Sequence, residues 1–268
     1  LSGLTIVLFL SYIDPKNLYK FSIFIFCFSL FLLFLVPIIG IEVNGSKRWL
    51  DLFVIPRIQP IEFVKPFFII ILSLIISSKK FDNLSLKFII TFFLTCFISI
   101  LLILQPDLGQ TLLIGFSWLI LIFISGINLI FLLTIFSLGA AVLFYMIFYI
   151  SKFEYIKNRL LSFFNPDTGS YNFQPDKAIE SITSGGYFGK GIGEGTLKNK
   201  VPEAHTDYII SVISEEFGVI AIILILVLFL IFIFSILKKV FSEEDEKIKL
   251  ILVGSISLIL AQAMIHIG

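Results

Sequence analysis

Residues 208–237 read YIISVISEEFGVIAIILILVLFLIFIFSIL, and every residue from Val219 to Phe234 is apolar. A helix needs ~20 apolar residues to cross ~30 Å of hydrocarbon at ~1.5 Å rise per residue, so this stretch is long enough to span a membrane. The rest of the chain has the same character, because 58% of its 268 residues are hydrophobic and only 15% are charged. Soluble domains carry about 25% charged residues. The sequence therefore predicts an all-α polytopic membrane protein.

Seven more apolar segments share this pattern, which gives eight predicted segments in total. They are residues 1–13, 21–41, 66–78, 86–104, 108–125, 128–150 and 250–268, with 66–78 borrowing residues from before Lys65 to complete its span. The connection from Glu42 to Lys65 is polar and contains proline. Both terminal segments are apolar and the chain begins with Leu1, so we expect a single transmembrane domain, 1–268, that is a fragment truncated at both ends.

The distribution of lysines predicts which loops lie on each side of the membrane. One alternating set of short loops is rich in lysine, for example at Lys79 and Lys80, and such loops are cytoplasmic. The connection 42–65, the turn at Asp107 and the large loop 151–207 then share the extracytoplasmic face. Within that loop, residues 151–164 have the pattern of an amphipathic surface helix. The net charge of +1 and the lack of a basic patch argue against nucleic acid as a partner.

The strongest polar cluster is VPEAHTDY at residues 201–208, which leads directly into the long apolar stretch. His205, Thr206 and Asp207 lie where an outer-face helix begins, and the positive end of the helix dipole favours a carboxylate there. Thr206 or Asp207 serving only as a helix cap is an equally good explanation of this window.

Two adjacent carboxyl groups, Glu215 and Glu216, follow inside the same apolar stretch. Asp207, Ser211 and Glu215 recur at helical spacing on one face. Carboxyl groups at membrane depth are costly, so they must be paired, protonated or facing a wet cavity. We favour a functional cavity, and pairing with a basic residue of a neighbouring helix is the alternative.

Weaker polar signals gather on the same face, and together they suit an anionic, membrane-borne substrate such as a lipid pyrophosphate. Each also has a structural explanation: interfacial anchoring for Arg48 and Trp49, an ion pair for Glu62 and Lys65, a tight turn for Gln105 to Asp107, and a flexible turn for the glycine-rich segment that contains Lys190.

Several ordered motifs resemble the SEDS family of peptidoglycan glycosyltransferases. They are Asn44-Gly-Ser-Lys-Arg-Trp49, Gln59-Pro-Ile-Glu62 with Lys65, Gln105-Pro-Asp-Leu-Gly109, Ser184-Gly-Gly with Gly189-Lys-Gly191, Pro202-Glu-Ala-His-Thr-Asp207 and Glu215-Glu-Phe-Gly218. Gln110 departs from the family, which usually has threonine there. The motifs are more similar to the division-specific branch of the family than to the elongation-specific branch.

The resemblance implies a helical bundle of ten spans, about eight of them present here, that polymerises lipid II into glycan strands. It also implies that Asp207 is the catalytic carboxylate, with a divalent cation (Mg or Mn) as an expected cofactor. The substrate-binding candidates are Arg48, Trp49, Glu62, Lys65, Gln105, Asp107, Lys190, His205, Thr206, Glu215 and Glu216. Expected partners are lipid II, membrane lipids, a class B penicillin-binding protein and other divisome proteins, at the septum of the bacterial inner membrane.

Two other functions fit parts of the pattern. A transporter that flips a lipid-linked precursor would place its polar residues near the midplane, where Glu215 and Glu216 are expected. An elongation-type polymerase would perform the same chemistry in the lateral wall.

Overall fold

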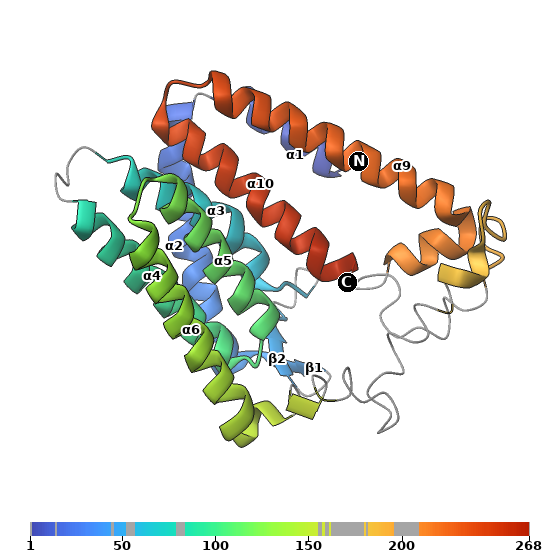
Figure 1. The fold of residues 1–268 in the computed structure, drawn as a ribbon, viewed down its shortest axis with the longest axis horizontal. Coiled ribbons are helices and arrows are strands. Elements are labelled where there is room, and N and C mark those ends of the chain that lie inside the picture. The colour runs from blue at the N-terminus through green and yellow to red at the C-terminus, as the bar shows by residue number, and fades with distance from the viewer. Residues whose placement is uncertain are drawn as a thin grey trace. The chain divides into compact units, whose positions relative to one another are not determined.

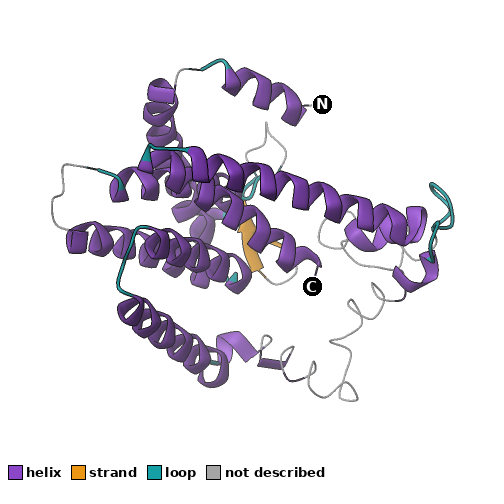
Figure 2. Cartoon of the chain, turned by 45° about the horizontal axis from the view of Figure 1, so that its top comes forward, coloured by secondary structure: helices purple, strands orange, loops and turns teal. Residues whose placement is uncertain are grey.

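The computed structural model describes residues 2–13, 15–43, 46–51, 57–78, 84–154, 157–158, 161, 180, 182–195 and 209–267. These residues are mostly helical, with one small β-hairpin (Figure 1, Figure 2). The elements are α1 (Ser2–Ser11), α2 (Pro15–Ile39), β1 (Ile41–Val43), β2 (Ser46–Trp49), α3 (Pro60–Ile76), α4 (Leu84–Leu104), α5 (Leu108–Ile124), α6 (Leu129–Tyr149), the 3-10 helix η1 (Ser151–Phe153), α9 (Ile209–Ser242) and α10 (Glu246–Ile267).

Five of the described helices are long and apolar enough to cross a membrane. The spans are Asn17–Ile39, Leu86–Leu104, Ile130–Tyr149, Ile209–Ser242 and Glu246–Ile265, and Leu108–Ile124 is a shorter apolar helix. The outer faces of these helices expose large apolar side chains, such as Phe24 at 69% and Phe93 at 67%. An exposed apolar face of this kind is suited to lipid, which confirms the predicted polytopic membrane fold.

The chain divides into two compact units, and unit 1 comprises Leu1–Leu132 with Glu243–Ile259. Within unit 1, α2 packs on α3 and α4 packs on α5, while α3 also contacts α4 and α5. The centre of this packing is a stripe on α3 formed by Val64, Phe68 and Leu72, which are completely buried. Their spacing of four residues places them on one helix face. Helix α3 is therefore the core element of unit 1.

The first half of α10 also belongs to unit 1 and makes a close approach at Gly254. A Cβ at this position would lie 2.5 Å from Cγ2 of Ile69 on α3 and 3.0 Å from Cδ2 of Leu121 on α5. Close packing of this kind through small residues is typical of membrane helix interfaces.

A two-stranded antiparallel hairpin follows α2 in unit 1, with Glu42 paired opposite Lys47. The backbone of Leu50 then exchanges two hydrogen bonds with Ile58, of 2.9 and 3.1 Å. No strand was predicted between residues 42 and 65, so the hairpin is a finding of the structure. It gives β2 a fixed place beside α2.

Unit 2 comprises Leu133–Ser242 with Leu260–Gly268. Its longest element, α9, has 34 residues and is broken at Gly218, where φ is 78° and ψ is −179°. Only glycine adopts this backbone conformation readily. The buried residues of α9 all precede or include the break, namely Ser211, Val212, Ser214, Glu215 and Gly218.

Each of the eight predicted segments is helical, and the differences are in the bounds. Helix α2 begins at Pro15 rather than at residue 21, and α9 continues to Ser242 rather than ending at residue 237. Helix α3 begins at Pro60, as the predicted extension of residues 66–78 requires. The predicted surface helix 151–164 begins as η1, and most of its remaining residues lie outside the described ranges.

Candidate functional site

The predicted site residues fall into three groups. Arg48, Trp49, Glu62, Lys65, Gln105 and Asp107 belong to unit 1, and Lys190, Glu215 and Glu216 belong to unit 2. His205, Thr206 and Asp207 lie outside the described residues. The two described clusters are presented separately.

In unit 1, Arg48 on β2 contacts the turn between α4 and α5. Its Nε lies 3.6 Å from Oδ2 of Asp107, and its Nη2 donates a hydrogen bond of 2.8 Å to the carbonyl oxygen of Pro106. Asp107 also caps α5, because its Oδ1 accepts a hydrogen bond of 3.3 Å from the backbone N–H of Gln110. The predicted tight turn is therefore also an ionic contact with the hairpin.

The electrostatics of Asp107 follow from its burial. Removal from water raises its pKa above the ordinary value of 3.8, and the positive charge of Arg48, the Gln110 N–H and the charge of Lys65 partly offset that rise. The nearby carboxyl of Glu62 raises the pKa further. A carboxyl in these surroundings depends on its cationic neighbours to remain ionised.

The second ion pair of unit 1 lies on the first two turns of α3. Nζ of Lys65 is 2.8 Å from Oε1 of Glu62, with a side-chain exposure of 2% for Lys65 and 43% for Glu62. The same Oε1 accepts a hydrogen bond of 3.4 Å from Nε2 of Gln110 on α5. This confirms the predicted i,i+3 ion pair and connects α3 to the start of α5.

Gln105 and Trp49 have less direct relations to this cluster. Gln105 is 2% exposed, and its Nε2 donates a hydrogen bond of 3.3 Å to the carbonyl of Leu33 on α2, which suits a structural role. Trp49 ends β2 opposite Ile41 and is half-buried.

In unit 2, the glycine-rich segment 182–195 supplies the partner of Glu215. Nζ of Lys190 lies 3.0 Å from Oε1 of Glu215, whose side chain is completely buried. The same ammonium donates a hydrogen bond of 3.0 Å to Oγ of Ser184. Of the three ways to accommodate a carboxyl here, the structure shows pairing, with a cation from the segment before α9 rather than from a neighbouring helix. Glu216 is half-buried beside it.

The structure adds two residues that were not predicted as part of either cluster, Gln110 and Ser184. Gln110 was noted only as a departure from a family pattern, and Ser184 only as part of a glycine-rich motif. In each case the signal was position alone, since Gln110 lies three residues after Asp107 and Ser184 lies six residues before Lys190. Neither spacing reveals a contact with Glu62 or with Lys190 without the fold.

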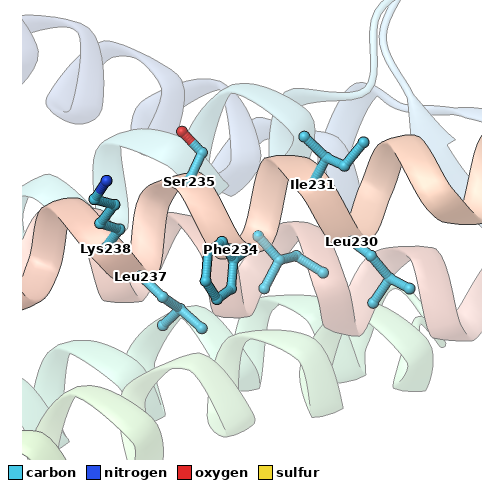
Figure 3. A pocket seen from close by; sticks show the side chains of 7 residues that line it. Leu230, Ile231, Phe234, Ser235, Leu237 and Lys238 are labelled. Carbon is cyan, nitrogen blue, oxygen red and sulfur yellow. The ribbon is translucent and has the colours of Figure 1, made fainter.

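A shallow hollow on α9 carries no comparable chemistry. The residues that line it all belong to this one helix, namely Leu230, Ile231, Ile233, Phe234, Ser235, Leu237 and Lys238 (Figure 3). Binding sites for polar substrates need several convergent polar groups, and this lining is mostly apolar. The hollow suits hydrocarbon chains better than a sugar or a phosphate.

The described residues also bear on the expected divalent cation, Mg or Mn. Within the described ranges, no group of three His, Cys, Asp or Glu side chains comes together, and the carboxylates of Glu62 and Asp107 are each paired with a cation. The expected divalent cation therefore stays a prediction.

The comparisons with known proteins agree with the predicted resemblance. The family model of FtsW, RodA and SpoVE, described as "Cell cycle protein", matches residues 1–268. A probable peptidoglycan glycosyltransferase FtsW of Caulobacter vibrioides is 30% identical over 267 residues, covering 98% of this chain and 66% of that protein. The Haemophilus influenzae protein of the same description is 33% identical over 227 residues, covering 80% of this chain and 55% of that protein.

A solved structure shares the fold. A chain from work on structural coordination of polymerization and crosslinking by a peptidoglycan synthase complex has a TM-score of 0.75 at 23% identity, covering 99% of this chain and 75% of that one. The chain spans less than two thirds of the length of the two curated relatives, at 66% and 55%. Because the family model matches from the first residue to the last, the chain belongs to the FtsW/RodA/SpoVE family of cell cycle proteins.

Proposed function

We propose that this chain is the membrane part of a peptidoglycan glycosyltransferase that polymerises lipid II into glycan strands during septal cell-wall synthesis. The observation that carries the proposal is a set of paired charges at one end of an apolar helical unit. Arg48 with Asp107, and Lys65 with Glu62, lie where α2 and α4 end and where α3 and α5 begin. Consecutive spans alternate in direction, so these four helix ends share one side of the membrane. Relatives bearing the name peptidoglycan glycosyltransferase support this reading.

In the proposed reaction, the 4-hydroxyl of an acceptor sugar attacks the anomeric carbon of a donor that carries undecaprenyl pyrophosphate. A carbon–oxygen bond forms, the bond to the pyrophosphate breaks, and the hydroxyl proton passes to a general base. Asp207 is the proposed base, on the strength of its motif and its position two residues before α9. His205 and Thr206 stay proposed substrate contacts of the same motif.

The departing pyrophosphate requires positive charge nearby. Arg48 is the better candidate of the two cations in unit 1, because its side chain is 33% exposed. Lys65 is 2% exposed and held by Glu62, so we assign it a contribution to the local potential rather than direct contact with phosphate. Mg or Mn remains a proposed cofactor, and no step above is derived through it.

The proposal includes a partner and a location. A similar fold occurs in work on a peptidoglycan synthase complex that couples polymerization to crosslinking. We therefore propose a class B penicillin-binding protein as partner, together with other divisome proteins, at the septum of the bacterial inner membrane with loop 151–207 outside. The alternative of a flippase is weakened by the pairing of Glu215 with Lys190, because a paired carboxyl is less available to a transported group.

The test is lipid II polymerisation by the full-length protein, reconstituted with its transpeptidase, in wild type, Asp207→Ala and Asp207→Asn. Asp51→Asn is the matched control, since Asp51 is an exposed carboxylate that pairs loosely with Arg57 at 3.9 Å. The proposal expects both Asp207 variants to lose strand formation while folding and partner binding persist, and the control to match wild type.

Two outcomes would contradict the proposal. If both Asp207 variants polymerise like wild type, that residue is a helix cap only. If wild type forms no strands but moves lipid II between leaflets of a vesicle, the transporter replaces the polymerase.

A further inference from the structure

The break in α9 is held by hydrogen bonds from the glycine-rich segment 182–195. The N–H of Lys190 donates to the carbonyl of Glu215 at 2.9 Å, and the N–H of Gly191 donates to the carbonyl of Glu216 at 3.1 Å. In an unbroken helix these two carbonyls would accept from Val219 and Ile220. The segment therefore supplies the donors that the helix has lost at its break.

Helix α9 also donates hydrogen bonds to the segment. The N–H groups of Val219 and Ile220 donate to the carbonyls of Gly186 and Tyr187, at 3.0 and 3.4 Å. Four bonds between segment and helix thus replace the two bonds that a continuous helix would make here. Backbone groups that lose their partners within a helix need others, so the break and the segment depend on each other.

Glycines permit this contact because any side chain would fill the space. A Cβ at Gly185 would collide with the carbonyl oxygen of Ser214, and one at Gly189 would collide with that of Glu216. The backbones lie in direct contact, so the direction of the first turns of α9 is set by the segment.

The Lys190–Glu215 ion pair joins the same segment to α9 through two side chains. Glu215 is completely buried and Lys190 is 35% exposed, and Ser184 holds the ammonium from the other side at 3.0 Å. Removing one partner of a buried pair leaves a charge without compensation. The pair therefore ties the side chains together where the backbone bonds already tie the main chains.

We propose that Lys190 and Glu215 are positioning residues for Asp207. This inference rests on the proposed function. Asp207 stands two residues before Ile209 in the sequence, and the turns that begin there are the ones that segment 182–195 orients. Lys190 and Glu215 then act through α9 rather than on the substrate, although both were predicted from the sequence as substrate-binding candidates.

The experiment measures kcat and KM for lipid II polymerisation by the full-length protein with its transpeptidase, per folded molecule. We expect Lys190→Met and Glu215→Gln each to lower kcat by about 100-fold, the size of effect that misplacement by ~1 Å produces, with KM for lipid II unchanged. Lys190→Arg, which keeps the cation, should remain near the wild-type kcat. Lys239→Met and Glu194→Gln, which alter exposed charges on α9 and in the same segment, should match wild type.

Three outcomes would overturn the inference. A lower Tm with a normal kcat per folded molecule would make the pair structural only. A raised KM with normal kcat would make Lys190 a substrate-binding residue. Loss of activity in Lys190→Arg equal to that in Lys190→Met would show that charge pairing with Glu215 is not what matters.

Glu215→Gln keeps the side-chain volume of Glu215 and one acceptor oxygen. If Lys190→Met does not fold, the kcat of Glu215→Gln therefore tests the positioning role by itself. Asp207→Asn is measured in the same series. If Asp207→Asn is fully active, the proposed function fails. If it is inactive while Lys190→Met and Glu215→Gln are normal, only the positioning role fails.

Discussion

Nε of Arg48 lies 3.6 Å from Oδ2 of Asp107, and the two side chains differ in burial, at 33% and 8% exposed. The arginine keeps contact with solvent, whereas the carboxylate has given up most of its hydration. Replacing Arg48 therefore leaves a buried charge on Asp107 without compensation, whereas replacing Asp107 leaves a charge on Arg48 that is still in contact with solvent. The first substitution should lower the stability more. This asymmetry gives the contact a pH dependence that can be measured.

We predict that Arg48→Met destabilises the protein more at neutral pH than at acid pH. The folded pKa of Asp107 is raised above 3.8, so stability from the protonated form is present at low pH and is lost as pH rises through the folded pKa. Without Arg48 this loss is larger and extends to higher pH. The difference in Tm from wild type should be small near pH 4 and correspond to about 1–3 kcal/mol near pH 7.

Thermal unfolding in detergent across this pH range checks the prediction, with Arg57→Met as control. Arg57 and Asp51 are 63% and 45% exposed at 3.9 Å, and such surface pairs contribute about 0–1 kcal/mol. A difference for Arg48→Met that does not vary with pH would contradict the argument.

The Glu62–Lys65 ion pair predicts that the single variant Glu62→Gln is less stable than the double variant Glu62→Gln/Lys65→Met. Glu62→Gln removes the negative charge beside an ammonium that is 2% exposed, and we expect a loss of about 1–3 kcal/mol in stability. Adding Lys65→Met removes the buried cation as well, so the double variant should recover part of that loss. Tm values of wild type, both single variants and the double variant form the cycle. Strict additivity would show that the two side chains do not interact.

Gly218→Ala tests the break in α9. Alanine must adopt a φ of 78°, which costs about 1–3 kcal/mol, and its Cβ would collide with the carbonyl oxygen of Tyr187. We expect a lower Tm and faster proteolysis. Gly115→Ala is the control, because Gly115 lies inside α5 with open space for a Cβ, so alanine should be neutral or stabilising by up to about 1 kcal/mol. Equal Tm changes in the two variants would mean that the break is not held in solution.

Gly254→Ala tests the packing of α10 in unit 1. The added Cβ would meet Ile69 and Leu121 at 2.5 and 3.0 Å, and overpacking of this kind costs about 1–3 kcal/mol. Gly254→Ala should cost less in an Ile69→Ala background than in wild type, since Ile69→Ala removes the Cγ2 atom that lies 2.5 Å from the added Cβ. Chemical denaturation in both backgrounds measures the effect, and a Gly254→Ala protein as stable as wild type would argue against this helix contact.

The helices were predictable because the length and apolarity of each run decide whether it spans a membrane. The residues at which the helices begin and end were less predictable. Helix α2 starts at Pro15, before Lys20, because a lysine stem can lie along a helix while its ammonium group reaches water. In the same way, α9 continues through Lys238 and Lys239 to Ser242.

The hairpin and the break depended on contacts that a single sequence does not display. Strands of three and four residues are too short to show an alternating pattern, although Asn44-Gly45 between them is a strong hairpin signal. Gly218 is one glycine among 17, and its role follows only from the nearby carbonyl of Tyr187.

The candidate site was predicted unevenly for a related reason. The i,i+3 spacing of Glu62 and Lys65 was enough to predict their ion pair. The partners of Arg48 and of Glu215 come from distant parts of the chain, so their residue types were predicted but their contacts were not.

The break at Gly218 also bears on how the chain enters the membrane during synthesis. At 34 residues, an unbroken α9 would be ~51 Å long, well beyond ~30 Å of hydrocarbon. The part after Gly218 measures ~36 Å and is enough by itself for the insertion machinery to recognise. The turns that carry Ser211, Ser214 and Glu215 are therefore not needed to reach the length of a full span.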